Sequence, residues 1–289
     1  MKRIYVLCVV LLTLAGGTLL AQGKWQVLMY PDPAPGVRNT FCFGINESGD
    51  MVGYYGSPTR GFLLTGGEYY SLLFPGATAS SAFGINAAGD IVGHYANSAV
   101  PGVVHGFVLR HGEFVTIDLE GQAMTHPRDI NARGDIAGSY MTTSTSPNVG
   151  FVLGRNGTVI DVQYPGATST VVSGINDRGD VTGWYNLGSG PTRSFVRTED
   201  GVFTPLDHPE AYTTQANKIS ADGTVFGWYD ENTAPPRISH GFVWRHGEFE
   251  QVDYPGAVGT MIHGANNQGE TCGMMKFLGV PWGGYGHVW

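Results

Sequence analysis

Short apolar segments alternate with turn-forming residues along most of the chain. The segments combine β-branched and aromatic residues with polar ones, as in Ile-Val-Gly-His-Tyr at 91–95. This pattern is typical of β-strands. No run after residue 21 has the roughly 20 apolar residues that a membrane helix needs. The pattern therefore predicts an all-β protein without a membrane span once its N-terminal segment is removed.

The segments belong to a repeat. The motif Gly-Ile-Asn-x-x-Gly-Asp, followed by an apolar pair, glycine, any residue and an aromatic, first spans residues 44–55. It recurs at 84–95, 129–140, 174–185, 218–229 and 264–275, and a Gly-Phe block follows most copies. The repeats begin near residues 39, 80, 125, 170, 214 and 260. This regular spacing predicts one tandem array over the whole chain after residue 21.

Each repeat contains four strand signals, which is the signature of a propeller blade. The Asn-x-x-Gly segment predicts a tight hairpin between the first two strands, with the glycine at positive φ. Pro205 lies in a fourth strand, and proline is largely confined to sheet edges. We therefore expect the fourth strand at the outer edge and the first strand nearest the axis.

The two ends of the chain are complementary. The sixth repeat stops at Trp289, inside its third strand, and residues 25–31 match residues 249–255 position for position. The sequence thus predicts a six-bladed β-propeller of four-stranded antiparallel blades, formed as a single domain by residues 22–289. In it the N-terminal strand, residues 25–31, completes blade six. A β-solenoid is the alternative architecture.

The N-terminus predicts export. Residues 1–21 combine a basic start, an apolar run and a small-residue exit, which is the layout of a signal peptide. The chain has 44 glycines, only 14% charged residues and a net charge of −8. Nucleic-acid binding normally requires a basic surface, so nucleic acid is not an expected partner.

The motifs resemble a named family. Gly-Ile-Asn-x-x-Gly-Asp-x-x-Gly-x-Tyr, His-Gly-Phe-Val at 105–108 and 240–243, and Phe-x-x-x-Asp-x-Pro-Gly-Ala are similar to the HAF-type probable extracellular repeat of bacteria. The resemblance covers residues 24–289. It implies a secreted or periplasmic bacterial protein built from tandem repeats, and it implies neither an activity nor catalytic residues.

A candidate ligand face follows from the residue that varies in the second strand. The position before its recurrent tyrosine changes from repeat to repeat, and the loops that follow also differ. Loops on a rigid scaffold commonly carry binding residues, and aromatic faces suit sugars. We take as candidate ligand-binding residues Tyr54, His94, Trp184, Trp228 and Trp282. Ordinary packing between blades is the other interpretation of these side chains.

The remaining motifs can be considered as metal, catalytic or disulfide sites. The Asn-x-x-Gly-Asp turns lack the concentrated carboxylates of a calcium loop, so we expect them to form turns. The histidines at 94, 105, 126, 240 and 263 show no metal-ligand spacing. We therefore predict no metal, cofactor or catalytic residue. Cys42 and Cys272 would meet only where the ring closes, and either form a disulfide there or remain separate buried thiols.

These expectations favour a secreted, non-catalytic binding or interaction scaffold that recognises a carbohydrate or a partner in the cell envelope. One alternative is a propeller enzyme such as a glycan lyase, a hydrolase or a lactonase. The other alternative is a structural protein of the envelope.

Overall fold

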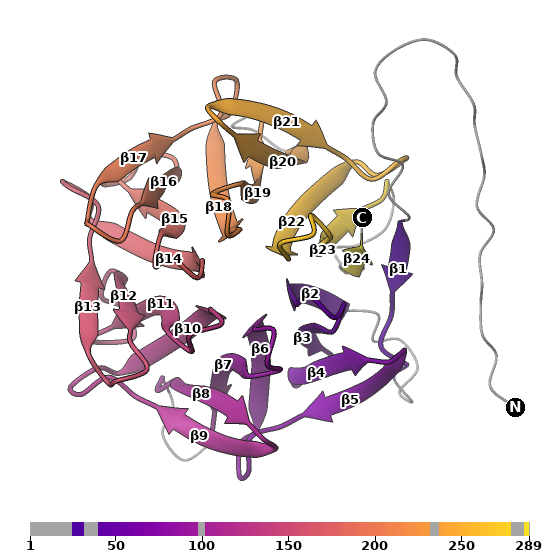
Figure 1. Cartoon of the computed structure of the whole chain (residues 1–289), viewed down its shortest axis with the longest axis vertical. Coiled ribbons are helices and arrows are strands. Elements are labelled where there is room, and N and C mark those ends of the chain that lie inside the picture. The colour runs from indigo at the N-terminus through magenta and orange to yellow at the C-terminus, as the bar shows by residue number, and fades with distance from the viewer. Residues whose placement is uncertain (1–24, 32–39, 98–101, 232–236, 279–285, 289) are drawn as a thin grey trace, which may run out of the picture.

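The protein is a ring of β-sheets around a central axis (Figure 1). The computed structural model describes residues 25–31, 40–97, 102–231, 237–278 and 286–288. Within these residues every helix or strand assigned is a strand, and none of them forms a helix that could cross a membrane. The described strands form six four-stranded antiparallel sheets. The predicted all-β propeller fold with four-stranded antiparallel blades is confirmed.

Five sheets each use four strands that are consecutive in the sequence. The first contains β2 (Thr40–Ile45), β3 (Met51–Tyr55), β4 (Arg60–Thr65) and β5 (Glu68–Leu72). The second contains β6 (Ala79–Ile85), β7 (Ile91–Ala96), β8 (His105–Arg110) and β9 (Glu113–Ile117). The third contains β10 (Met124–Ile130), β11 (Ile136–Met141), β12 (Val149–Leu153) and β13 (Val159–Val162). The fourth contains β14 (Ser169–Ile175), β15 (Val181–Asn186), β16 (Arg193–Arg197) and β17 (Phe203–Leu206). The fifth contains β18 (Thr213–Ile219), β19 (Val225–Asp230), β20 (Ser239–Arg245) and β21 (Glu248–Val252).

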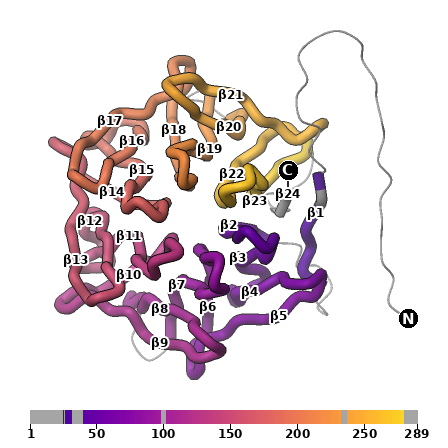
Figure 2. Tube along the Cα trace, in the orientation of Figure 1, coloured from indigo at the N-terminus to yellow at the C-terminus, as the bar shows by residue number. Residues whose placement is uncertain are grey.

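The remaining sheet joins the two ends of the chain. It contains β22 (Gly259–Ala265), β23 (Thr271–Lys276), β24 (Gly286–Val288) and β1 (Gln26–Leu28). Strand β1 pairs antiparallel with β24, so that Val27 lies opposite His287. Figure 1 shows this N-terminal strand beside the C-terminal one, and Figure 2 traces the ring in the same orientation. The pairing is the one that the match between residues 25–31 and 249–255 predicts.

The order of strands within a sheet also follows the prediction. The first strand of each repeat lies nearest the axis and the fourth forms the outer edge (Figure 1). Pro205 lies in β17, at such an edge, where its missing N–H leaves no ladder partner unsatisfied. The chain then crosses from each outer strand to the innermost strand of the next sheet.

These crossovers fix neighbouring sheets to each other. At four crossovers the residue before the proline stacks on the recurrent tyrosine of the next sheet, in the pairs Tyr30–Tyr55, Phe74–Tyr95, Tyr164–Tyr185 and His208–Tyr229. The rings of Tyr164 and Tyr185 are 3.7 Å apart. At every crossover the backbone N–H of the residue at this position donates to a hydroxyl in the next innermost strand. This bond recurs six times, in the pairs Tyr30–Thr40, Phe74–Ser80, Leu119–Thr125, Tyr164–Thr170, His208–Thr214 and Tyr254–Thr260. The recurrent tyrosine thus packs between neighbouring sheets.

Every innermost strand contains a β-bulge. Its register against the second strand slips by one residue, as between Val172 and Gly174 opposite Gly183 and Thr182. The same slip occurs in the other five sheets. The extra residues are Phe43, Phe83, Arg128, Ser173, Asn217 and His263. A bulge re-aims the side chain of its extra residue, and here six such residues surround the axis.

The recurrent glycine of the second strand makes this bulge possible. A Cβ on Gly183 would lie 2.0 Å from the carbonyl oxygen of Val171 in the facing strand. The corresponding distances at Gly53, Gly93, Gly138 and Gly227 lie between 1.8 and 2.3 Å. The two backbones therefore approach too closely for any side chain. By contrast, the turn glycines are retained for their positive φ, which is 95° at Gly179.

The two cysteines of the ring lie at the junction of its first and last sheets. Cys42 and Cys272 are fully buried in one cluster with Leu28 and Phe62, and both are free thiols. Burial raises the pKa of the Cys42 thiol, and the neighbouring Cys272 raises it further. The two thiols therefore meet at the seam, as expected, but the disulfide that the sequence allowed is not formed in this structure.

We expect Gly183→Ala to lower the free energy of unfolding by about 3 kcal/mol, because its Cβ would displace the backbone at Val171. Urea unfolding followed by fluorescence measures this. The control is Gly190→Ala, since a Cβ at Gly190 approaches only the Leu187 oxygen, at 3.4 Å. Equal losses in the two variants would show that the bulge does not require glycine.

Candidate functional site

The six bulge residues line one cavity in the central channel. Its volume is about 200 Å³. Each sheet contributes its bulge side chain, and four further residues complete the wall: Asp129, Trp184, Gln215 and Lys218. The bulges thus bring together six side chains of different chemistry that lie about 45 residues apart in the sequence. We call this cavity the bulge cavity.

One side of the bulge cavity is aromatic. The rings of Phe43 and Phe83 are 4.8 Å apart, and His263 lies 4.8 Å from Phe43 on its other side. Trp184, from the second strand of the fourth sheet, also lines the cavity. An aromatic wall offers apolar faces on which the C–H face of a ligand can pack.

Polar groups cover the rest of the wall. The Asn217 amide nitrogen donates to the Ile262 carbonyl at 2.8 Å and lies 3.3 Å from His263 Nδ1, which leaves its Oδ1 available as an acceptor. The Gln215 side chain makes no hydrogen bond to a described residue. The cavity therefore combines aromatic faces with free amide donors and acceptors.

Arg128 contributes a positive charge to the wall of this cavity. Burial lowers its pKa, although a guanidinium remains charged in proteins. Its Cζ lies 5.8 Å from the centre of the Phe83 ring, and its buried Nε has no hydrogen-bond partner among the described residues. No described carboxylate forms an ion pair with it.

A salt bridge crosses the channel beside the bulge cavity. Lys218 Nζ lies 2.5 Å from Asp129 Oδ1, and the other Asp129 oxygen accepts the Ile175 N–H at 2.9 Å. The pair joins the third, fourth and fifth sheets. Asp129 and Lys218 occupy the position that is glycine in the other four repeats. Lys218 lines this cavity and a second one, so the pair lies between the two.

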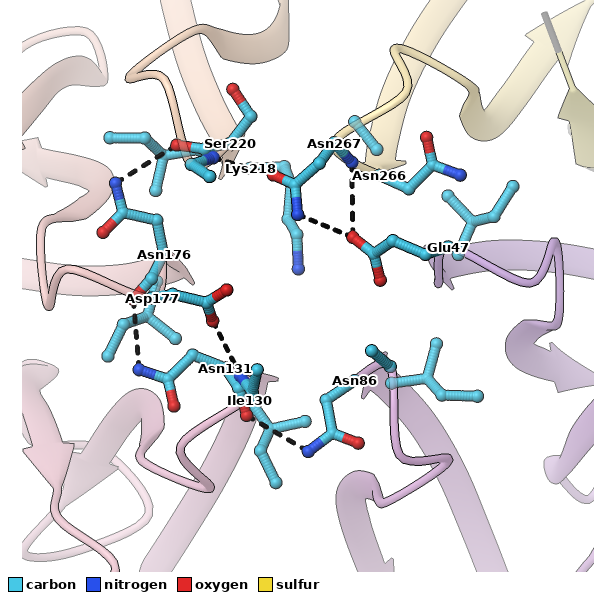
Figure 3. A pocket seen from close by; sticks show the side chains of 18 residues that line it. Glu47, Asn86, Ile130, Asn131, Asn176, Asp177, Lys218, Ser220, Asn266 and Asn267 are labelled. Atoms are coloured by element: carbon cyan, nitrogen blue, oxygen red, sulfur yellow. Dashed lines mark hydrogen bonds between the residues drawn. The ribbon is translucent and has the colours of Figure 1, made fainter.

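The second cavity, of about 210 Å³, lies among the Asn-x-x-Gly turns at one mouth of the channel (Figure 3). Each turn asparagine donates from Nδ2 to the backbone carbonyl of the equivalent residue in the next sheet, as Asn131 does to Asn176 at 3.1 Å. The same bond runs from Asn46, Asn86, Asn176 and Asn266. We call these bonds the asparagine belt.

The belt explains why the turns repeat so strictly. Asn46 Oδ1 accepts the backbone N–H groups of Ser48 and Asp50, so the oxygen shapes its own turn while the nitrogen joins the next sheet. Ser220 replaces asparagine in the fifth sheet, and at that junction Asn267 Oδ1 accepts the Ala221 N–H at 2.7 Å. These amides are engaged in structure, as the turn interpretation predicts, so the second cavity offers fewer free groups than the bulge cavity.

The structure separates the candidate ligand residues chosen from the sequence. Trp184 lines the bulge cavity, whereas Tyr54 and His94 lie behind its wall, 5.3 Å from Phe43 and 4.9 Å from Phe83 respectively. Trp228 lines neither cavity, and its indole N–H has no partner among the described residues. Trp282 lies outside the described residues.

Sequence reasoning missed the bulge residues. The signal was present in the residue before the glycine that opens the repeated motif, or before its replacements Asp129 and Lys218. That residue differs in chemistry from repeat to repeat: Phe, Phe, Arg, Ser, Asn and His. It varies inside an otherwise repeated motif, as does the second-strand position that was selected. The bulge directs this residue to the axis, and the spacing of the repeats in the sequence does not reveal the bulge.

The histidines do not form one cluster. His105 and His240 pair with Asp118 and Asp253, with nitrogen–oxygen distances of 2.8 and 2.7 Å. These contacts join third strands to the segments after fourth strands, away from the axis. Among the described residues, no group of three or more His, Cys, Asp or Glu side chains is placed to hold a metal ion.

His94 and His126 form a buried pair behind Arg128. Their Nδ1 atoms are 3.4 Å apart. Burial, together with His126 and Arg128, lowers the pKa of His94 to about 3, and burial together with Arg128 lowers that of His126 to about 4. Both rings are therefore neutral near pH 7 and add no charge to the cavity.

Comparisons with known proteins support the fold alone. A scan against models of protein families and a search of curated proteins gave no match. A solved structure described as a gluconolactonase is 12% identical, with a TM-score of 0.53 over 93% of this chain and 92% of its own. A variant of the Aleuria aurantia lectin, solved with Fucalpha1-6GlcNAc, is 10% identical, with a TM-score of 0.51 over 93% and 96%. The chain is similar in fold to propeller lectins and to this gluconolactonase.

We expect Lys218→Met to lower the free energy of unfolding by about 3 kcal/mol, because it leaves a buried carboxylate at Asp129 without its cation. Adding Asp129→Gly, the residue of four other repeats, should recover at least half of that loss. A double-mutant cycle by urea unfolding measures the coupling. Purely additive losses would show that the pair contributes nothing.

We also expect stability to fall as the pH drops below about 6.5. The unfolded chain takes up protons on both histidines near pH 6.5, whereas the folded protein takes them up only near 4 and 3. Between its unfolded and its folded pKa, each histidine should therefore lower the free energy of unfolding by about 1.4 kcal/mol for each unit that the pH falls. Unfolding curves at several pH values measure the slope. His94→Gln with His126→Gln should flatten it, and the exposed control His111→Gln should not; equal slopes in both variants would contradict the assignment.

Proposed function

We propose that the chain is an exported six-bladed propeller that binds a carbohydrate in the bulge cavity. The repeated crossover bonds, the bulge in every sheet and the pairing of β1 with β24 support six equivalent blades closed by the N-terminal strand. The pattern of residues 1–21 and the resemblance to HAF-type repeats support export to the periplasm or the medium.

The observation that carries the proposal is the composition of the cavity wall. Phe43, Phe83 and Trp184 supply aromatic surface, while Gln215 and Asn217 present amide groups that can bond to hydroxyls. Sugars combine an apolar C–H face with a rim of hydroxyls, so they need this combination. The volume of about 200 Å³ is below the range usual for drug-sized ligands and suits one sugar ring.

The number of carboxylates in the bulge cavity favours carbohydrate binding over glycan cleavage. Hydrolysis of a glycosidic bond ordinarily uses two carboxyl groups on opposite sides of that bond. Among the described residues that line the bulge cavity, Asp129 is the one carboxylate, and it is held by Lys218 and the Ile175 N–H. The propeller fold itself is compatible with both functions, since it is shared with lectins and a gluconolactonase.

The test is a glycan array followed by calorimetry on residues 22–289. We expect at least one saccharide to bind with one site per chain, and Trp184→Ala to weaken it about 10-fold, or about 1.4 kcal/mol. Phe83→Leu provides a second cavity variant should Trp184→Ala fold poorly. The control is Tyr70→Ala, an exposed aromatic on the outer strand β5.

Two results would contradict the proposal. The first is an array without any carbohydrate signal for the folded protein. The second is binding that both cavity variants leave unchanged, which would place the saccharide outside the channel.

A further inference from the structure

We propose that the sugar bound in the bulge cavity carries a carboxylate, as hexuronates do, and that Arg128 holds this group. This inference rests on the proposed function and specifies its ligand class. The fold leaves one positive charge in the channel, that of Arg128, without an opposite charge.

Arg128 is a partly buried cation of the cavity wall, and it forms no ion pair with a described carboxylate. The other cation of the wall, Lys218, is already paired with Asp129 at 2.5 Å. The two cations and one carboxylate therefore leave one net positive charge in the cavity. Removing an ion from water is expensive unless an opposite charge compensates it. A ligand with one negative charge would supply that compensation.

The surroundings of Arg128 favour a ligand rather than a protein partner for its guanidinium. The Phe83 ring lies beside it at 5.8 Å, and the neighbouring histidines 94 and 126 are kept neutral. None of these groups carries a negative charge that would neutralise the guanidinium. The Nε is enclosed and has no hydrogen-bond partner among the described residues, so the protein leaves this donor of a cavity-lining guanidinium unsatisfied.

The chemistry of the guanidinium selects the type of anion. Its planar set of N–H donors matches the two oxygens of a carboxylate in a bidentate pair. A phosphate monoester carries about −1.5 to −2 charges at pH 7, which exceeds the single net charge of the wall. A carboxylate carries one. With the carboxylate at Arg128, the sugar ring can lie against the aromatic side while Gln215 and Asn217 meet its hydroxyls.

The experiment compares matched sugars by calorimetry. The acids are D-glucuronate and D-galacturonate, the neutral partners are glucose and galactose, and galactose 6-sulfate and galactose 6-phosphate test other anions. We expect at least one hexuronate to bind 10-fold or more tightly than its neutral partner and more tightly than the sulfate and the phosphate. Tighter binding of the sulfate or phosphate ester would overturn the assignment of a carboxylate.

Arg128→Gln tests the residue. It should reduce the affinity for the hexuronate to that for the neutral sugar and leave the neutral sugar unchanged. Arg128→Lys, which keeps the charge without the planar donor set, should fall between the two and serves if Arg128→Gln does not fold. The matched control is Arg193→Gln, an arginine beside Asp207 at the outer side of the fourth sheet.

The outcomes separate the two proposals. If neutral sugars bind as tightly as their acids, or if Arg128→Gln weakens both equally, the carboxylate inference is wrong while carbohydrate binding stands. If no saccharide binds the folded protein, the proposed function itself is wrong. If a hexuronate binds and its affinity is unchanged by both Arg128→Gln and Trp184→Ala, the site is not the bulge cavity.

Discussion

The close approach of the first and second strands at the bulge determines how the rest of the ring is built. An extra residue in each innermost strand brings its backbone so near the second strand that a Cβ on Gly183 would lie 2.0 Å from a carbonyl oxygen. Glycine is therefore required there, and it recurs in every repeat. The same bulge turns one side chain per sheet toward the axis. One local irregularity thus explains both the least variable residue of the repeat and the most variable wall of the channel.

The side chains that line the channel can differ between repeats, because the bonds that join neighbouring sheets are repeated on either side of it. At one mouth the asparagine belt joins successive sheets through backbone carbonyls, and farther out the crossovers join them through a hydroxyl and a stacked ring. Tyr30 makes the same stacked contact with Tyr55, at 3.6 Å, although it follows β1 at the other end of the sequence. The bulge residues take no part in these repeated bonds. Their chemistry can change without loss of the ring, as a rigid scaffold for a binding site requires.

Most of the fold was predictable because it is repeated. Recurrence exposed the four strands, the glycine at positive φ, the inner position of the first strand and the complementary ends. The site was less predictable, because it depends on where the repeats differ. Two positions vary, and regular alternation favours the second-strand one, which holds Tyr54, His94 and Trp228. A bulge breaks that alternation, so the first-strand residues Arg128 and Asn217 reach the axis instead. A register slip of one residue leaves no trace in the repeat length.

Two charged residues that stand where other repeats have glycine, directly after the bulge residue, show how charge is arranged in the channel. Asp129 and Lys218 replace glycine in the third and fifth repeats, and each compensates the other across the fourth sheet. A buried pair of this kind contributes little net stability, but loss of one member is costly. Arg128 adjoins Asp129 in the sequence, yet Asp129 is already held by Lys218 and the Ile175 N–H. The salt bridge therefore withdraws the nearest carboxylate from Arg128, and the guanidinium faces the cavity with its charge uncompensated. That separation of one paired and one unpaired cation is the reason why we propose an acidic ligand, rather than a merely polar one, for the bulge cavity.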